Sequence, residues 1–161
     1  MIKVEEISEI NEEWSKAVGR AVLTFGNLEW VTYQCLGLFS TDKIFETVVS
    51  LNYAKRIDLI LEILSGKKLE GKTFAKANEL FSEAKAKAKI RNVFVHNPLG
   101  VGIYQDQEGN IQLKDEIRHY RESNKVYNLE DIQAFGKECE ELELKIMELI
   151  GQMRKEIDSN N

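Results

Sequence analysis

The sequence of 161 residues has one proline, two cysteines and two histidines. Cys35 and Cys139 lie far apart, with no Cys-x-x-Cys or Cys/His spacing, so neither a disulfide framework nor a structural zinc site is expected. We expect both to be buried thiols. No run of about eighteen apolar residues and no basic-then-apolar leader is present, which predicts a cytoplasmic protein that does not enter a membrane.

Several familiar motifs are also missing from the sequence. No Walker loop, G-x-S-x-G, H-E-x-x-H or EF-hand pattern is present, so the common nucleotidase, esterase and metal-dependent classes are not indicated. No metal or other cofactor is expected. Because no repeat or flexible linker divides a chain of this length, we predict a single domain over residues 1–161.

Charge is unevenly distributed along the chain. The net charge is −5, but residues 67–91 carry eight Lys/Arg against three Glu, whereas residues 129–158 carry four Lys/Arg against nine Asp/Glu. The basic segment could bind a polyanion such as RNA. The alternative is a solvated helix face balanced by an acidic neighbour.

Apolar residues recur at three- and four-residue intervals over most of the chain, which is typical of amphipathic helices. Thr41 or Asp42 could cap the second helix, Gly66 would end it, and Asn128 would open the last one. The expected helices cover residues 5–38, 43–65 with a bend near 50–52, 73–95 and 128–157.

Residues 101–113 interrupt this pattern. Val101, Ile103, Ile111 and Leu113 alternate with other residues around the turn sequence DQEGN, which predicts a short hairpin. Amphipathic helices with short links bury their apolar stripes against one another. The fold class is therefore predicted as all-α, an up-and-down bundle of four to five helices with a short β-hairpin insertion before the last helix.

The segment KIRNVFVHNPLG, residues 89–100, holds the most unusual combination of side chains. Arg91 lies on the apolar seam of its helix, where an unpaired guanidinium would be costly to bury. His96 is rotated about 140° from Arg91 on an ideal helix. Pro98 stops the helix, so we expect His96 to be accessible at a frayed helix end.

The other face of the same helix is polar. Lys85, Lys89, Asn92 and His96 follow one another along this face, while Arg91 must curl round from the flank or meet the histidine of a second copy. A histidine can transfer a proton near neutral pH, and an arginine can stabilise charge on phosphoryl oxygens. Metal-free RNA cleavage needs both, because RNA supplies its own nucleophile, the 2′-hydroxyl.

The element RNVFVH resembles the R-N-x-x-x-H signature of HEPN domains (higher eukaryote and prokaryote nucleotide-binding). FGNLEW at 25–30, SLNYAKRIDLILEIL at 50–64 and YNLEDIQAF at 127–135 are similar to other helical segments of that family. The resemblance implies a metal-independent endoribonuclease that leaves a 2′,3′-cyclic phosphate and a 5′-hydroxyl. It implies His96 as the acid/base, Arg91 as the transition-state stabiliser, and Asn92 as the group that orients the histidine or the phosphate.

The resemblance also implies a homodimer whose two motifs face one cleft, and a toxin or phage-defence effector with a possible cognate antitoxin or regulatory protein. One branch, paired with nucleotidyltransferase antitoxins, has tyrosine two residues after the histidine. Here that position is Pro98, which argues against that pairing. RNA would be the substrate, with Lys85, Lys89 and Arg121 as candidate RNA-binding residues.

Other residues have a structural and a functional interpretation. Glu29 lies at the edge of the first helix's stripe and could pair with Arg91 across the bundle, or could be a surface glutamate. Gly26 favours a close helix crossing over a ligand site. Trp14 and Trp30 are better explained as core or dimer contacts than as base-stacking platforms.

The segment around His119 and Arg121 could extend a phosphate-binding surface or be an ordinary solvated loop. Two alternatives to the ribonuclease also stay open. One is a non-catalytic HEPN-like module that binds a nucleotide or a protein, in which Arg91 and Asn92 anchor the bundle. The other is an antitoxin or regulatory subunit whose acidic last helix docks a basic partner.

Overall fold

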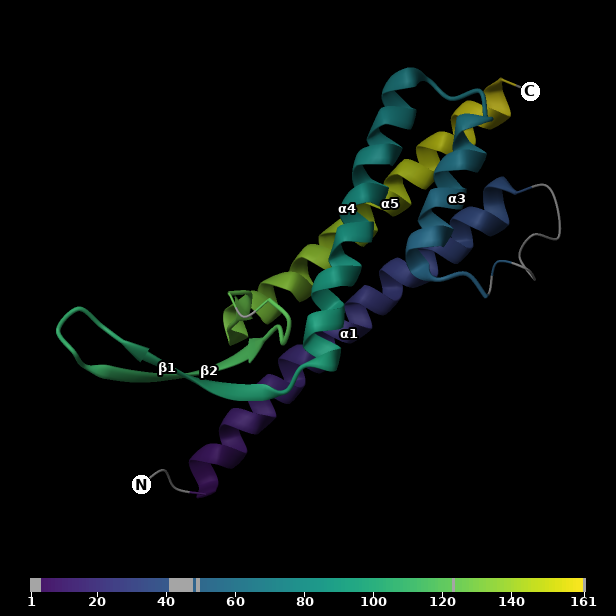
Figure 1. The fold of residues 1–161 in the computed structure, drawn as a ribbon. Helices are drawn as coiled ribbons and strands as arrows, with labels where there is room; N and C mark the ends of the chain where they lie inside the picture. Colours follow the sequence, from purple (N-terminus) through teal and green to yellow (C-terminus); the bar gives the residue numbers. More distant parts are fainter. Residues whose placement is uncertain (1–3, 41–47, 49, 123, 161) are drawn as a thin grey trace.

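The computed structural model describes residues 4–40, 48, 50–122 and 124–160, with side chains from residue 12 onward. Within these ranges it contains four α-helices and one small antiparallel sheet placed before the last helix (Figure 1). The elements are α1 (Val4–Phe39), α3 (Tyr53–Ser65), α4 (Gly71–His96), β1 (Leu99–Gln105), β2 (Ile111–Arg118), β3 (Val126–Tyr127) and α5 (Leu129–Ser159). The mainly helical class with a hairpin insertion is as predicted.

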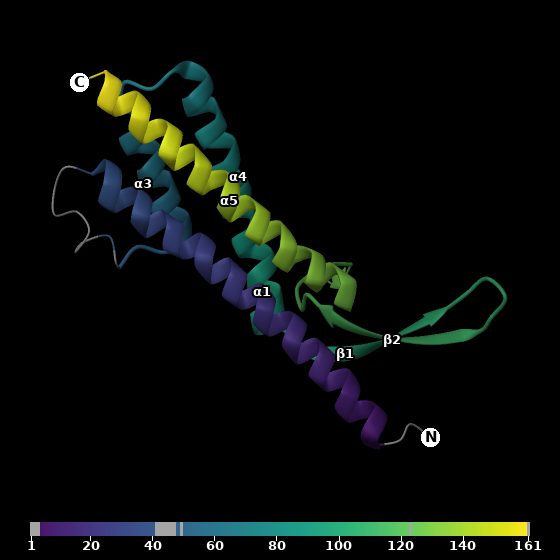
Figure 2. The same ribbon diagram turned by 180° about the vertical axis from the view of Figure 1, so that it is seen from behind.

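The helices α1, α3 and α5 run in one direction and α4 runs in the other (Figures 1 and 2). Phe25 of α1 contacts Tyr53 at the start of α3, and Thr32 contacts Arg56 one turn later, so these two helices are parallel. The predicted up-and-down alternation therefore applies from α3 to α5. It does not apply between α1 and α3, because α3 begins beside the middle of α1.

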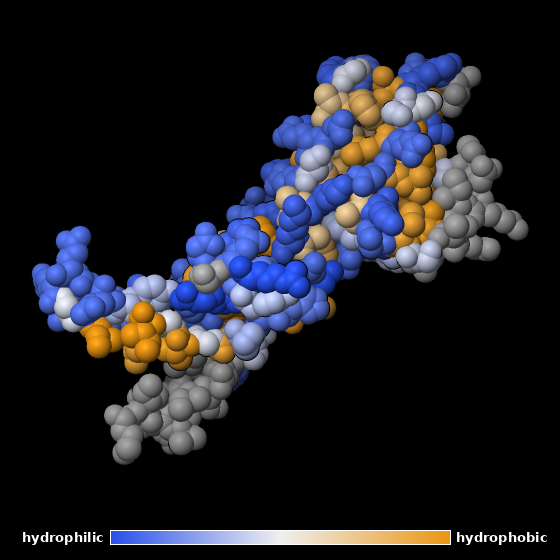
Figure 3. Space-filling view, viewed as in Figure 1, coloured by the Kyte–Doolittle hydropathy of each residue, from blue (hydrophilic) through white to orange (hydrophobic). Residues whose placement is uncertain are grey.

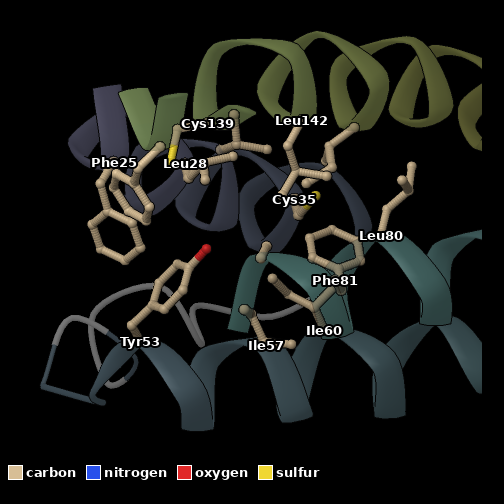
Figure 4. Packing of buried hydrophobic residues seen from close by; sticks show 14 of the residues in the cluster. Phe25, Leu28, Cys35, Tyr53, Ile57, Ile60, Leu80, Phe81, Cys139 and Leu142 are labelled. Carbon is tan, nitrogen blue, oxygen red and sulfur yellow. The ribbon is translucent and has the colours of Figure 1, made fainter. Parts of the chain in front are cut away.

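The core lies where the four helices meet, and Figure 4 shows side chains from all of them converging there. Fully buried members include Phe25, Leu28, Ile57, Phe81 and Leu142. Each apolar stripe faces the other helices, as expected for amphipathic helices that bury one face. Cys35 and Cys139 are both free and buried here, which confirms the interpretation of these residues as core thiols.

Local capping sets the helix ends. The Asn128 side chain accepts a hydrogen bond from Asp131 N at 2.8 Å, and Asp131 accepts one from Asn128 N at 2.9 Å, which is a capping box. The predicted start of the last helix at Asn128 and the predicted end of the second helix at Gly66 are both confirmed. The predicted caps Thr41 and Asp42, and part of the 43–65 helix, lie outside the described residues.

The hairpin is longer than predicted and gains a third strand. The strand β1 pairs with β2 in a register that matches Ile103 with Leu113 and Gln105 with Ile111. At the turn, Gly109 has φ +86°, a conformation that glycine adopts without a steric cost, and Asp106 accepts from the N–H of Glu108 and Asn110. The hairpin projects from the bundle, with apolar side chains gathered on one face (Figures 1 and 3).

The two tryptophans differ in environment. Trp14 is buried at 6% exposure, whereas Trp30 is 60% exposed on α1. Trp14 is therefore a core residue, and the predicted core role does not extend to Trp30. None of the described helices is both long enough and apolar enough to cross a membrane.

Candidate functional site

A hollow of about 560 Å³ opens between α1, the first turn of α3 and the second half of α4. Its volume falls in the range of small-ligand sites. Seven of the ten residues that line it have charged or amide side chains, four of them cationic and one anionic. The lining residues are Glu29, Asn52, Tyr53, Ala54, Arg56, Lys85, Ala88, Lys89, Arg91 and Asn92.

Glu29 lies between two arginines at the floor of this hollow. Its Oε1 atom is 3.6 Å from Nη2 of Arg91 and also 3.6 Å from Nη2 of Arg56. The predicted contact between Glu29 and Arg91 across the bundle is therefore present. The carboxylate compensates two positive charges at a distance longer than a hydrogen bond.

Arg56 was not singled out from the sequence, yet it is the most constrained cation of the hollow. Its side chain is 6% exposed. Its Nε donates to Thr32 Oγ1 at 3.2 Å and its Nη1 donates to the Leu51 carbonyl at 2.6 Å. The guanidinium also lies 4.3 Å from the centre of the Tyr33 ring. Arg56 is thus held by two hydrogen bonds and an aromatic contact, and it supplies one of the two positive charges beside Glu29.

Arg91 is placed differently. Its side chain is 24% exposed, and its Cζ atom lies 4.8 Å from the centre of the Phe25 ring. Apart from the long ion pair with Glu29, it makes no hydrogen bond to any described residue. A guanidinium has five N–H donors. Those of Arg91 are accordingly available to an anion that enters the hollow.

Three further predicted residues line the same hollow. Asn92 is exposed, and Lys89 is exposed beside it on α4. Lys85 lies at the rim and pairs with Asp58 of α3 at 2.6 Å. The positive charge of Lys85 is therefore partly compensated, and Lys89 and Arg91 supply the less compensated charge.

Tyr53, next to Asn52 at the start of α3, turns its hydroxyl away from this lining. Figure 4 shows the hydroxyl among the core side chains near Leu28 and Cys139. It has no hydrogen-bond partner among the described residues. Burial, and secondarily the charge of Glu29, raises the pKa of this phenol well above its usual value, so Tyr53 remains neutral and packs as a core side chain.

His96 lies outside the hollow. It is the last residue of α4, its side chain is exposed, and it is not among the residues that line the Arg91 site. This placement agrees with the expected rotation of about 140° between the two side chains. Within one chain the arginine and the histidine therefore leave α4 in different directions, and His96 lies one turn beyond Asn92.

His96 is exposed, as predicted, but the end of its helix is hydrogen-bonded where a frayed end was expected. The next residue, Asn97, is 9% exposed, and its Nδ2 donates to the Val93 carbonyl at 2.9 Å. Its Oδ1 accepts from Tyr120 N at 3.0 Å. Asn97 therefore closes the helix end and ties it to the segment after β2, so the backbone at His96 is held in place.

Arg121 belongs to this segment after β2 and not to the hollow. Its Cζ atom lies 5.1 Å from the centre of the Tyr120 ring. Its backbone N–H donates to His119 Nδ1 at 3.2 Å, and Glu122 N donates to the same nitrogen at 3.0 Å. These bonds make Nδ1 an acceptor and leave the proton of a neutral imidazole on Nε2.

Glu122, in the segment after β2, is influenced by the charge of Lys89, which lines the hollow. The pKa of Glu122 is held below its usual value chiefly by its hydrogen bond and ion pair with Lys125, and more weakly by the charges of His119 and Lys89. Since Lys89 also lines the hollow, Lys89 links the two regions of positive charge.

A metal site is not part of this arrangement. Across the part of the chain that the structure describes, no group of three or more His, Cys, Asp or Glu side chains is placed to hold a metal ion. Comparison of the chain with models of known protein families, with curated proteins and with solved structures gives no significant match.

Proposed function

We propose that this protein is a HEPN-type endoribonuclease that cleaves RNA without a metal ion. The observation that carries the proposal is the Arg91 guanidinium, which faces a cationic hollow beside Asn92 with no hydrogen bond to any described residue. Such a group can bind a phosphodiester through two parallel N–H···O bonds. The Arg91 guanidinium lies over the Phe25 ring and beside Glu29, which also pairs with Arg56.

In the proposed reaction the RNA 2′-hydroxyl attacks the adjacent phosphorus. A bond forms between O2′ and phosphorus, the bond from phosphorus to O5′ breaks, and the products are a 2′,3′-cyclic phosphate and a 5′-hydroxyl. His96 takes the proton of the 2′-hydroxyl, and a second imidazole or water gives a proton to O5′. Arg91 stabilises the negative charge on the phosphorane oxygens, and Asn92 orients the phosphate.

Because His96 lies outside the hollow of its own chain, the proposed active form is a homodimer in which the two motifs share one cleft. RNA would enter along Lys85, Lys89 and Arg121. The biological role that fits is a cytoplasmic toxin or phage-defence effector, restrained by a cognate antitoxin or regulatory protein.

The test is cleavage of single-stranded RNA in excess chelator. We expect wild type to cleave and both His96→Ala and Arg91→Ala to lose at least about a hundredfold in rate, the usual scale of a lost acid/base or charge-stabilising group. Arg154→Ala is the matched control for Arg91→Ala, since it removes an arginine that pairs with Asp158 away from the hollow. Analysis of the product ends would identify the cyclic phosphate.

A second candidate is a non-catalytic module that binds a nucleotide, and the separation of His96 from the hollow favours it. In that case wild type binds a mononucleotide, Arg91→Ala abolishes binding, and His96→Ala has no effect on binding or on RNA. Toxicity on expression that His96→Ala relieves would favour the nuclease. A regulatory subunit would show neither activity, and its acidic α5 would bind a basic protein.

A further inference from the structure

A second hollow lies at the base of the hairpin, where β1 leaves the end of α4 (Figure 1). Its volume of about 320 Å³ is at the lower end of the range for small-ligand sites, which suits a single nucleobase. We call this hollow the hairpin pocket. The residues that shape it come from the end of α4, both long strands and the segment after β2, and they include Asn97, Gly100, Glu116, His119 and Tyr120.

Glu116 is the buried charge of the hairpin pocket, with 4% of its surface exposed. Its Oε2 atom accepts from the Tyr104 hydroxyl, and its Oε1 atom accepts from Nε of Arg118 at 2.9 Å. Burial alone would raise the pKa of Glu116, but these hydrogen bonds outweigh burial and hold that pKa below its usual value. Glu116 is therefore a carboxylate at neutral pH, and it accepts hydrogen bonds only.

Two glycines of β1 lie on the same face of the sheet as Glu116. Gly100 pairs with Glu116 across the two strands, and a Cβ atom added at Gly100 would meet no described atom within 4 Å. A Cβ atom added at Gly102 would lie 2.5 Å from Oε2 of Glu116 and 2.7 Å from a ring carbon of Tyr104. Glycine inside a strand costs stability and marks places where a ligand approaches closely. The sequence of β1 thus leaves the space above the carboxylate open.

Aromatic rings line the pocket on the side of the segment after β2. The rings of His119 and Tyr120 are nearly parallel, with an angle of 13° and 5.7 Å between their centres. The backbone N–H groups of Arg121 and Glu122 hold His119 through Nδ1, and Tyr120 N donates to Asn97 Oδ1. Aromatic rings that are fixed in this way are suited to stack on a nucleobase.

We propose that the hairpin pocket binds a guanine base. Guanine carries two adjacent donors on its Watson–Crick edge, N1–H and the 2-amino group. The Glu116 carboxylate accepts from both, with the guanine taking the place of the Tyr104 hydroxyl at Oε2. The Arg118 guanidinium beside it donates to guanine O6, and the base stacks on the rings of His119 and Tyr120.

The other three RNA bases fit this set of side chains less well. Adenine, cytosine and uracil each have an acceptor directly beside the donor on the same edge. That acceptor would face the Glu116 carboxylate, which has no proton to donate. A buried carboxylate therefore selects for guanine by leaving the other bases with an unpaired acceptor.

The role of this pocket in cleavage rests on the proposed function. Asn97 and Pro98 line the pocket, and His96 is the residue before them at the end of α4. A guanosine held there would place its own phosphate beside the helix end that carries His96. Cleavage is accordingly expected next to guanosine, whereas the binding of the base itself requires no cleavage.

The first test is isothermal titration calorimetry of the full chain, without RNA, with the 5′-monophosphates of guanosine, adenosine, cytidine and uridine. We expect guanosine monophosphate to bind at least about tenfold more tightly than the other three, the scale of one hydrogen bond to a charged group. Inosine monophosphate, which lacks the 2-amino group, should bind more weakly than guanosine monophosphate. Equal affinities for the four nucleotides would overturn the proposal.

The second test removes the charge from the pocket. Glu116→Gln should weaken the binding of guanosine monophosphate to the level of adenosine monophosphate, because an amide presents a donor where guanine needs an acceptor. Glu108→Gln is the matched control, since it makes the same change at the exposed turn of the hairpin. A guanine preference that persists in Glu116→Gln would contradict the assignment.

A third variant guards against a general loss of structure in Glu116→Gln. Gly100→Val leaves Glu116 and its partners unchanged but fills the space above them, and no described atom lies within 4 Å of its Cβ position. We expect the variant to keep the circular dichroism spectrum of wild type and to lose nucleotide binding. Binding of guanosine monophosphate that survives in a folded Gly100→Val variant would place the nucleotide elsewhere and reject the pocket.

Mapping of the cleavage positions in a mixed-sequence RNA separates this inference from the proposed function. Wild type should cut next to guanosine, and Glu116→Gln should lose that preference. Tight binding of guanosine monophosphate with no cleavage would support the pocket and reject the nuclease. Cleavage without any preference among the bases would leave the nuclease standing and reject the place of the pocket in the reaction.

Discussion

At the scale of single residues, the site depends on two arginines that share Glu29 but differ in their surroundings. Arg56 donates hydrogen bonds to Thr32 and Leu51 and is almost fully buried, so its role is to hold the floor of the hollow. Arg91 has one long ion pair and an aromatic contact. A residue that is partly exposed and weakly bonded is suited to bind a ligand.

This difference leads to opposite expectations for stability and activity. We expect Arg56→Ala to lower the free energy of unfolding by about 3–5 kcal/mol, since it removes one partner of a buried, hydrogen-bonded charge cluster. Arg91→Ala should cost about 1 kcal/mol or less, because a long, partly exposed ion pair contributes little. Urea unfolding followed by circular dichroism measures both. A larger loss for Arg91→Ala than for Arg56→Ala would favour the packing role of Arg91.

The sequence pattern pointed to Arg91 and not to Arg56 as a site residue, although both arginines lie on the apolar stripe of a helix. Arg56 lies on the inner face of its helix between Tyr53 and Ile60, as Arg91 lies on the seam of α4. A charged residue on an apolar stripe was the clue in each case. The contact of both with Glu29 depends on how three helices pack, and spacing along the chain does not contain that information.

The cysteines give a second expectation at this scale. Burial raises the pKa of Cys35 and of Cys139 from 9.0 to about 12. At pH 8 the thiolate fraction is then about one in ten thousand in the folded protein and about a tenth in the unfolded chain. We expect both thiols to react with Ellman's reagent at least about a hundredfold faster in urea than in buffer.

The sign of the linked effect on folding follows from the raised pKa. Because ionisation is disfavoured in the folded state, the two thiols leave stability unchanged below pH 9 and reduce it as the pH rises from 9 towards 12. An introduced Ser82→Cys is the exposed control and should react rapidly in buffer. Equal rates for native and introduced thiols would contradict the buried placement.

At the scale of elements, the end of α4 depends on Asn97. Its side chain bonds to the Val93 carbonyl and to Tyr120 N, so one buried carboxamide joins the helix that carries His96 to the segment after β2. Pro98 could be predicted to stop the helix. The hydrogen-bonded end of the helix could not be predicted, because the bond to the Asn97 side chain comes from Tyr120, a residue 23 positions away.

We expect Asn97→Ala to lower stability by about 1–3 kcal/mol, since it leaves Tyr120 N without its buried partner. Hydrogen exchange should become faster at residues 95–97 and 119–121 while the core of α5 stays protected. Asn78→Ala, on the exposed face of the same helix, is the control. If exchange rises equally throughout the chain, Asn97 is not a local clamp.

The elements themselves could largely be predicted from the sequence. Repeated apolar spacing located the four helices, and Gly66 and Asn128 marked ends that the structure shares. The third strand was missed because Val126 and Tyr127 are too few to show a period. The parallel course of α1 and α3 was missed because apolar periodicity fixes the face that a helix buries, while the direction depends on the connection.

At the scale of the whole molecule, an acidic protein concentrates its positive charge around one hollow. The net charge is −5, yet Arg56, Lys85, Lys89 and Arg91 converge there from two helices. The acidic α5 instead packs along α1 and α4, where Glu138 and Glu140 pair with Lys87 and Arg20. The proposed binding of a polyanion is therefore expected on the face of the hollow.

This distribution sets the expected salt dependence of RNA binding. Lys85 is partly compensated by Asp58, so Lys89, Arg91 and Arg121 are the cations available to phosphates. For single-stranded RNA, three phosphate contacts give a slope of about −2 for the logarithm of the association constant against that of the salt concentration.

Fluorescence anisotropy with the non-cleaving His96→Ala variant measures this slope. Lys89→Gln should reduce the slope by about 0.7. Lys76→Gln, which removes a lysine paired with Glu79 away from the hollow, should leave the slope unchanged. A slope near zero for the His96→Ala variant would show that phosphates are not what the hollow binds.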